Sequence, residues 1–147
     1  MSAKIFFCYT HEDEPLLNKL KTHLKSLQRL GLIRVWYDRE ISPGAEWEQE
    51  INKHLFTAQV VLLLVSPDFI ASDYCYGTEM KRAIELHELG RTYVIPIILR
   101  PSYWQDTPLS KFQVLPSNGR PVTSWTGRDG RDRALLDVTM GIKAWFK

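Results

Sequence analysis

The sequence is poor in cysteine and has no long apolar run. Its two cysteines, Cys8 and Cys75, do not form a C-x-x-C pair, and no signal peptide precedes them. This favours a reduced, cytoplasmic setting and speaks against a zinc site. The longest apolar run, Val60 to Val65, is far shorter than the roughly 20 residues that a bilayer-spanning helix needs. We therefore expect no membrane insertion by this segment.

The chain also lacks a charge excess and the common motifs for phosphate or metal chemistry. Lysine and arginine number 19 against 17 acidic residues, and the net charge of +2 gives no electrostatic reason to expect a nucleic-acid partner. Neither G-x-x-x-x-G-K-S/T nor G-x-G-x-x-G occurs, and the 4 histidines include no H-E-x-x-H. These absences disfavour phosphate-loop enzymes, hydrolase triads and zinc chemistry, so we expect no resident metal and no cofactor.

Length and composition fit one globular domain. Of the 147 residues, 44% are hydrophobic and 24% are charged, which is close to the globular average and excludes a disordered or collagen-like chain. A chain of this length buries enough surface to form a core without disulfides. We predict a single domain over residues 1–147, as a module of a longer protein.

Strand-like and helix-like segments alternate along the chain. Runs rich in apolar and β-branched residues predict strands at residues 4–9, 33–37, 59–65 and 93–99, with a fifth at 121–122. Apolar residues at helical spacing predict helices at residues 16–30, 47–55, 74–89 and 131–146, the first and third ended by Gly31 and Gly90. Pro96 indicates that one side of the fourth strand is not fully paired. Because parallel strands need crossover helices, we predict an α/β fold: a flavodoxin-like five-stranded parallel sheet, order 2-1-3-4-5, with helices on both faces.

Candidate functional residues follow the first three predicted strands, because ligands of such sheets bind beyond the carboxyl ends of the strands. These loops and the helices after them offer Tyr9, Thr10, Asp38, Trp47, Cys75 and Glu79. On a helical wheel Glu79 falls at the border of the inward stripe, so its carboxylate points either into the crevice or into solvent. Asp38 equally fits a turn cap, Trp47 a core residue and Cys75 a small buried residue.

Three segments carry a family resemblance. They are Ile5-Phe-Phe-Cys-Tyr-Thr-His-Glu-Asp13, Val35-Trp-Tyr-Asp-Arg-Glu-Ile-Ser-Pro-Gly44, and Val61-Leu-Leu-Leu-Val-Ser-Pro-Asp-Phe-Ile-Ala-Ser-Asp-Tyr-Cys75 with Glu79 following. In this order they resemble Toll/interleukin-1 receptor (TIR) domains, most closely those of bacterial type, over essentially the whole chain. One departure is local: many enzymatic members carry Trp-Cys-x-x-Glu, whereas Cys75 stands four residues before Glu79 and no Trp precedes it.

The resemblance implies the predicted sheet and one of two activities. Some TIR domains are adaptors that act through TIR–TIR contacts, and others cleave NAD between nicotinamide and ribose. In the enzymes a glutamate of the third helix is catalytic, and Glu79 matches it. By the same resemblance Tyr9, Thr10, Asp38, Trp47 and Cys75 would line the NAD site. NAD would be a substrate, giving nicotinamide and ADP-ribose or a cyclic ADP-ribose product.

The resemblance also implies a setting: cytoplasmic immune or anti-phage signalling, switched on by self-association and by a fused sensor or oligomerisation domain. A non-catalytic TIR adaptor is the alternative. A phosphoacceptor receiver domain is excluded, because it needs an Asp at the end of the third strand, where this chain has Val65-Ser66. A nucleoside deoxyribosyl-transferring enzyme, which also uses a Glu on ribose, is disfavoured by the segment 36–44.

Overall fold

Four parallel strands form the sheet of the computed structural model, which describes residues 2–36 and 46–146. The strands are β1 (Ala3–Cys8), β2 (Ile33–Trp36), β3 (Val60–Val65) and β4 (Tyr93–Ile98), in the order β2-β1-β3-β4. In register, Phe6 of β1 lies opposite Trp36 of β2 and Val61 of β3. The first four predicted strands and their parallel order are confirmed.

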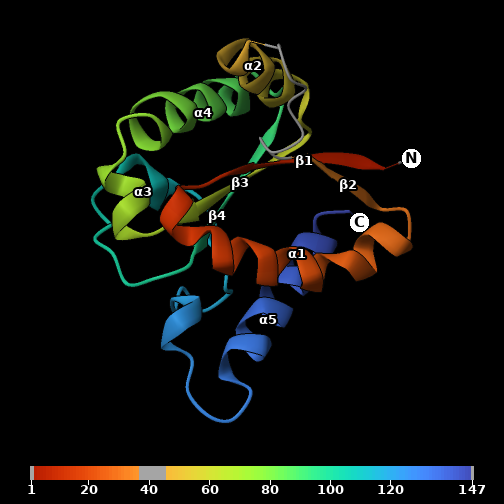
Figure 1. The fold of residues 1–147 in the computed structure, drawn as a ribbon, viewed down its shortest axis with the longest axis vertical. Coiled ribbons are helices and arrows are strands. Elements are labelled where there is room, and N and C mark those ends of the chain that lie inside the picture. The colour runs from red at the N-terminus through yellow and green to blue at the C-terminus, as the bar shows by residue number, and fades with distance from the viewer. Residues whose placement is uncertain (1, 37–45, 147) are drawn as a thin grey trace.

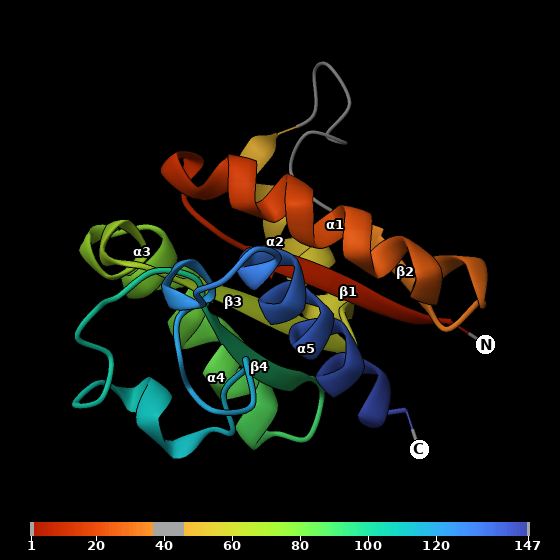
Figure 2. The same cartoon turned by 90° about the horizontal axis from the view of Figure 1, so that it is seen from below.

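Helices cover both faces of this sheet, as the alternating pattern predicted (Figure 1). The helices are α1 (Glu14–Arg29), α2 (Trp47–Thr57), α3 (Pro67–Ala71), α4 (Met80–Glu88) and α5 (Gly130–Ala144), with a π-helical turn at Cys75–Glu79 directly before α4. Short 3-10 turns occur at His11–Asp13, Pro108–Lys111 and Val122–Ser124. Figure 2 shows α1 and α5 side by side over one face, while α2, α3 and α4 pack on the other.

Alternation along the strands divides the core into two layers. Successive strand residues point to opposite faces. Ile5 and Phe7 of β1 therefore join the cluster beneath α1 and α5, whereas Phe6 and Cys8 join the cluster beneath α2 and α4. All six residues of β3 are buried, as expected for a strand covered on both sides. The direction of Cys8 is thus fixed by its position in β1.

The ends of the helices follow the expected signals. Gly31 and Gly90 follow the C-cap residues of α1 and α4 and have φ of 74° and 75°, a conformation that costs other residues more than glycine. Ser66 ends β3 and caps α3, because its hydroxyl accepts a hydrogen bond from the Phe69 N–H at 3.1 Å. The short helix α3 was not predicted. Its single turn, from Pro67 to Ala71, is too short to show a period in the sequence.

The prediction of a fifth strand at residues 121–122 is wrong. Val122 starts a 3-10 turn in which the Ser124 N–H bonds to the Pro121 carbonyl at 2.9 Å. Val122 is the lone apolar residue there, between a proline and two polar residues, so no alternating strand pattern can form. Among the residues described, β4 is therefore an edge strand of the sheet.

The free side of β4 meets Leu115, which forms an isolated parallel bridge with Ile97. The Leu115 N–H donates to the Pro96 carbonyl at 2.9 Å, and the Leu115 carbonyl accepts from the Ile98 N–H at 2.8 Å. Because a strand residue directs its N–H and C=O to the same side, the donor that Pro96 lacks falls on this side and not on β3. The interpretation of Pro96 as a mark of incomplete pairing is confirmed.

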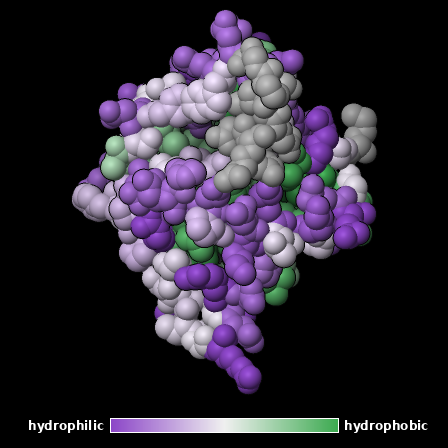
Figure 3. Space-filling model, in the orientation of Figure 1, coloured by the Kyte–Doolittle hydropathy of each residue, from purple (hydrophilic) through white to green (hydrophobic). Residues whose placement is uncertain are grey.

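Hydrophilic residues predominate on the face of the molecule seen in Figure 3, and the hydrophobic ones form small, separate patches. The apolar side chains instead gather between the layers, where Leu20 and Leu64 are fully buried. Within residues 2–36 and 46–146, no helix has both the length and the apolar character needed to cross a membrane.

Candidate functional site

The predicted site residues follow β1 and β3 at one edge of the sheet. Tyr9 and Thr10 come directly after β1, and the π-helical turn with Cys75 and Glu79 follows β3 and α3. Carboxyl ends of parallel strands share an edge, so segments far apart in the sequence meet here. Trp47 enters from the first residue of α2. Asp38, the remaining predicted residue, lies outside the described residues, as does the Pro43-Gly44 turn.

The π-helical turn sets the direction of Glu79. The Glu79 N–H bonds to the Tyr74 carbonyl at 2.9 Å, and the Met80 N–H bonds to the Cys75 carbonyl. Both are bonds to the fifth residue back, so the turn holds one residue more than an α-helical turn. It therefore accommodates the extra residue by which Cys75 and Glu79 differ from the spacing Cys-x-x-Glu. Such turns are uncommon inside helices and occur often at functional sites.

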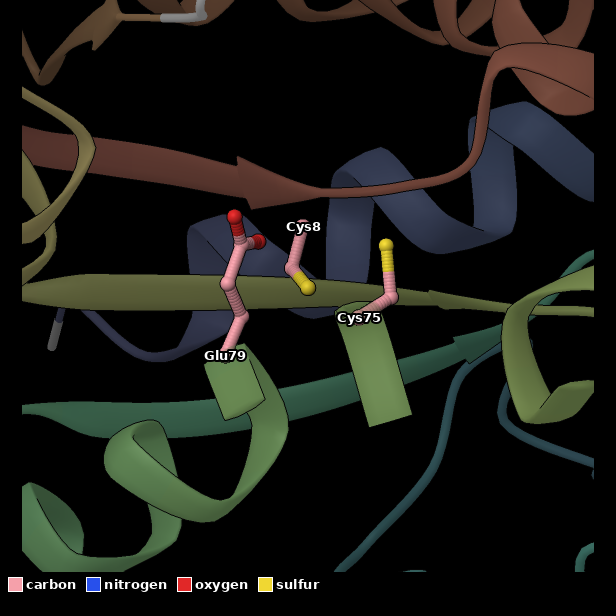
Figure 4. Close-up of side chains that lie close together, drawn as sticks. All are labelled: Cys8, Cys75 and Glu79. Atoms are coloured by element: carbon pink, nitrogen blue, oxygen red, sulfur yellow. The ribbon is translucent and has the colours of Figure 1, made fainter. Parts of the chain in front are cut away.

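Glu79 is more deeply buried than the helical wheel predicted. It is 6% exposed, not at the border between core and solvent. The wheel assumed 100° per residue throughout, but residues of a π turn advance by a smaller angle, which shifts the positions that follow. Glu79 and Cys75 consequently point from the same segment toward the end of β1 (Figure 4). Of the two directions left open by the sequence, into the crevice or into solvent, the burial of Glu79 excludes the second.

The surroundings of Glu79 bury its carboxylate, and the acidity of the neighbouring groups is altered. The Sγ atoms of Cys8 and Cys75 and a carboxylate oxygen of Glu79 all lie within 4.8 Å of one another. Burial is the main cause that raises the pKa of the Cys8 thiol well above its ordinary value, and a hydrogen bond with Cys75 and the negative charge of Glu79 raise it further. Burial, followed by the charge of Glu79, likewise raises the pKa of Tyr74. A thiol at Cys8 is therefore neutral at physiological pH.

Aromatic rings surround the Glu79 carboxylate on the α2 side. A cavity of about 60 Å³ is lined by Phe6, Phe7, Tyr9, Trp36, Trp47, Ile51, Tyr74 and Glu79. The rings of Trp47 and Tyr74 lie 5.0 Å apart between centroids, tilted by 40°. Trp47 is 47% exposed, so of its two predicted interpretations the structure favours a cavity wall over a core residue.

A second, larger cavity lies beside the first and shares Tyr9 with it. Its volume is about 430 Å³, and its lining includes Tyr9, Thr10, Ser72 and Cys75. The structure thus brings Tyr9, Trp47 and Glu79 to one cavity and Tyr9, Thr10 and Cys75 to the other. The Cys75 thiol donates a hydrogen bond to the Tyr9 carbonyl at 3.2 Å, which ties the two segments together at the boundary.

The hydroxyl of Thr10 is engaged by the protein itself. It donates to the Asp13 carboxylate at 3.1 Å and does not cap the following turn through its side chain. Asp13 is fully buried and also accepts from Ser66 and, at 2.8 Å, from Nε of Arg100. Arg100 also pairs with Asp68, and its hydrogen bond to Asp13 is the main cause that raises its pKa. This network fixes the loops around the larger cavity.

Sequence reasoning missed Asp13 and Arg100 as a pair, and it treated Cys8 only as a buried strand residue. A buried charge almost always has a partner, yet 87 residues separate Asp13 from Arg100, and nothing local joins them. The position of Arg100 two residues after the last residue of β4 was the available signal, because it places Arg100 at the carboxyl-end edge of the sheet, where ligands of such folds usually bind.

Comparisons with known proteins agree with this architecture. A family model described as a TIR domain matches residues 5–135. The chain is 44% identical over 139 residues to y4lF, an uncharacterized protein of Sinorhizobium fredii. The match covers 95% of this chain but 42% of that relative, so the chain spans less than half the length of the protein it resembles.

Solved structures show the same fold at low identity. The TIR domain of the Toll-related receptor TRR-2 from Hydra magnipapillata matches with a TM-score of 0.60 at 18% identity, covering 95% of this chain and 97% of the other. The TIR domains of the activated Roq1 resistosome, which recognises the pathogen effector XopQ, match with a TM-score of 0.55 at 19% identity. This match covers 94% of this chain and 84% of the other. With the family model matching most of its length, the chain belongs to the TIR domain family.

Proposed function

We propose that this TIR domain cleaves NAD⁺ at the bond between nicotinamide and ribose. The observation that carries the proposal is the buried carboxylate of Glu79, which borders an aromatic cavity at the ligand-binding edge of the sheet. Membership in the TIR family supports it, because the family includes NAD-cleaving members in which a glutamate of this helix is catalytic. Trp47, Tyr9 and Tyr74 supply the flat surfaces that planar bases bind against.

A single carboxylate is enough for this reaction. Nicotinamide leaves NAD⁺ as a neutral molecule, taking the electron pair of the broken bond, so no general acid is required for its departure. The ribose that remains develops oxocarbenium character. The negative charge of Glu79 stabilises this positive charge, and it does so strongly because the carboxylate is buried among rings and thiols. Attack by water gives ADP-ribose and a proton, whereas attack by the adenine gives a cyclic product.

The cavities suggest how the dinucleotide would lie. Pockets for ligands of this size usually have about 300–1,000 Å³, so the cavity of about 430 Å³ beside Cys75 is large enough for part of NAD⁺. The cavity of about 60 Å³ at Glu79 has room for little more than water. We propose that the nucleotide occupies the larger cavity and that Tyr9 moves aside to admit the nicotinamide ribose to Glu79.

The direct test is to incubate the purified chain with NAD⁺ and to separate the products by chromatography. We expect nicotinamide with ADP-ribose or its cyclic isomer from the parent, and neither from Glu79→Gln. Glu85→Gln is the matched control, because Glu85 is an exposed carboxylate on α4 and its loss should leave the products unchanged. If the parent forms no nicotinamide at any protein concentration, the enzymatic function is wrong.

A non-catalytic adaptor is the second candidate, and the small volume beside Glu79 favours it. The two candidates share one property, association through TIR–TIR contacts.

In an enzyme whose pocket is completed by a neighbouring copy, the activity per molecule rises with protein concentration or crowding. The family resemblance implies that residues 38–45, after the second strand, would contact that neighbour, and these residues lie outside the described ones. A specific activity that stays constant over a wide dilution series would contradict assembly-dependent catalysis.

We further propose that the domain acts in cytoplasmic immune or anti-phage signalling as one module of a larger protein. The relative y4lF supports the modular part of this proposal, since 42% of its length matches the chain and the remainder has room for a sensor or an oligomerisation domain. An infection assay in a bacterial host separates the outcomes. Protection that is lost in Glu79→Gln supports the proposal, whereas equal survival with and without the parent protein contradicts it.

A further inference from the structure

The cluster of Cys8, Cys75 and Glu79 has the composition of a metal site. Cys8 comes from the end of β1, and Cys75 and Glu79 come from the first and last residues of the π-helical turn. Their two sulfur atoms and a carboxylate oxygen all lie within 4.8 Å of one another, and all three residues are buried. Figure 4 shows Cys8 between the other two. In the described part of the chain, no other group of histidine, cysteine or acidic side chains meets this criterion.

The spacing fits a single tetrahedral ion. With Zn–S bonds of about 2.3 Å and Zn–O bonds of about 2.0 Å, neighbouring ligands of one zinc ion lie roughly 3.5–3.8 Å apart. Atoms that already lie within 4.8 Å of one another reach this spacing by small side-chain rotations. Two thiolates select soft or borderline ions such as Zn²⁺, and they exclude Mg²⁺ and Ca²⁺, which prefer oxygen ligands.

Two cavities border the cluster. Cys75 lines the cavity of about 430 Å³, and Glu79 lines the smaller cavity on the other side of Tyr9. With three protein ligands, the fourth position of a tetrahedral ion is left for water from the larger cavity, as in sites that are not purely structural. Binding converts both thiols to thiolates and releases two protons to solvent. The two thiolate charges then balance the charge of the ion.

We propose that Cys8, Cys75 and Glu79 form a binding site for one zinc-type divalent cation, and that the bound ion switches off the site by engaging the Glu79 carboxylate. Binding itself does not depend on the proposed function. The inhibitory effect does, because it requires that the same carboxylate stabilises the ribose cation. A carboxylate whose oxygens are bonded to an ion is held in place by that ion and is no longer available to contact the ribose.

The binding experiment uses the purified, reduced chain and Zn²⁺ alone. Competition with a chromophoric chelator should give one ion per chain, bound at least about tenfold more weakly by Cys75→Ser. Co²⁺ in place of Zn²⁺ should show the near-ultraviolet thiolate-to-cobalt absorption that only cysteine ligands produce. Absence of stoichiometric binding, an unchanged affinity in Cys75→Ser, or a cobalt spectrum without this absorption would overturn the site.

Two further variants test whether weaker binding comes from a lost ligand or from misfolding. Cys8 is completely buried in a strand, so Cys8→Ala is informative only where circular dichroism shows a folded protein. Glu79→Gln retains the shape of the side chain, removes its charge and should also weaken binding. Glu85→Gln, on the exposed side of α4, should bind Zn²⁺ as the parent does.

The inhibition experiment compares two curves measured on the parent protein. NAD⁺ cleavage should fall with free Zn²⁺ over the same range in which the ion binds, and a chelator should restore it. Full activity at saturating Zn²⁺ would overturn the inhibitory part of the proposal. A parent that binds Zn²⁺ through its thiols but never cleaves NAD⁺ would refute the proposed enzymatic function and the inhibition together, and would leave the metal site standing.

Discussion

The two faces of the sheet are built from the same strands but differ in chemistry. In β1, Ile5 and Phe7 point to the α1/α5 face, while Lys4 and Cys8 lie on the opposite side, where the Lys4 ammonium contacts His54 and Thr57 of α2. The α1/α5 face is packed with aliphatic side chains such as Leu20 and Leu24. Both faces bury large apolar side chains, but alternation along β1 places its titratable groups on the α2/α4 face alone.

The most severe effect on function should come from the α2/α4 face. Glu79→Gln is expected to lower NAD⁺ cleavage by about a hundredfold or more, because the charge and not the shape of the side chain stabilises the ribose cation. The initial rate of nicotinamide release, measured on protein with an unchanged circular dichroism spectrum, checks this. Unaltered turnover in folded Glu79→Gln would remove Glu79 from the catalytic role and weaken the contrast between the faces.

The opposite face should respond in stability alone. Leu20 of α1 is fully buried in the α1/α5 core cluster, so Leu20→Ala should lower the free energy of unfolding by about 2–5 kcal/mol through lost burial and the cavity left behind. Urea unfolding measures this. Activity per folded molecule should match the parent, and a fall in that activity beyond the unfolded fraction would show that the two faces are coupled.

Alkaline pH should affect the α2/α4 face selectively. Burial raises the pKa of Cys8 above its ordinary value of 9.0, so the unfolded chain loses the thiol proton first as pH rises. The contribution of the protonated Cys8 thiol to the free energy of unfolding is therefore complete below pH 9.0. Above this pH it declines by up to about 1.4 kcal/mol per pH unit. Urea unfolding across this range should show a shallower decline in Cys8→Ala than in the parent, while Leu20→Ala keeps the parental slope. Equal slopes in the parent and Cys8→Ala would contradict this.

The smallest expected change in stability and activity comes from Trp47, at the edge of the α2/α4 face. Because Trp47 is 47% exposed, Trp47→Ala should lower stability by only about 1 kcal/mol. Loss of stacking should raise the KM for NAD⁺ roughly two- to tenfold. Trp125→Ala provides the comparison, since Trp125 packs beside the α1/α5 core and should leave KM unchanged. A large loss of stability with an unchanged KM would show that Trp47 acts as a core residue and not as a wall of the NAD⁺ site.

Local patterns predicted the fold better than the site. Buried strands such as Val60–Val65 and the leucine spacing of α1 are repeated signals, and each was found where predicted. The fifth strand rested on one apolar residue, Val122, and was wrong. Burial of Glu79 depended on a π turn, which a wheel with constant helical period cannot represent. The meeting of Cys8 with Cys75, and of Asp13 with Arg100, arises from tertiary contacts that no local spacing records.

The proline in β4 has a consequence for how copies of this domain can join. An exposed sheet edge offers unpaired N–H and C=O groups on which another chain can add a strand, a common origin of fibrous aggregation. At this edge Pro96 lacks an N–H donor, and Leu115 already occupies the Pro96 carbonyl and the Ile98 N–H. Continuous growth of the sheet across β4 is therefore blocked. Reversible assembly in a signalling protein is better served by contacts between side chains on helices and loops, which can be made and broken without remaking a strand ladder.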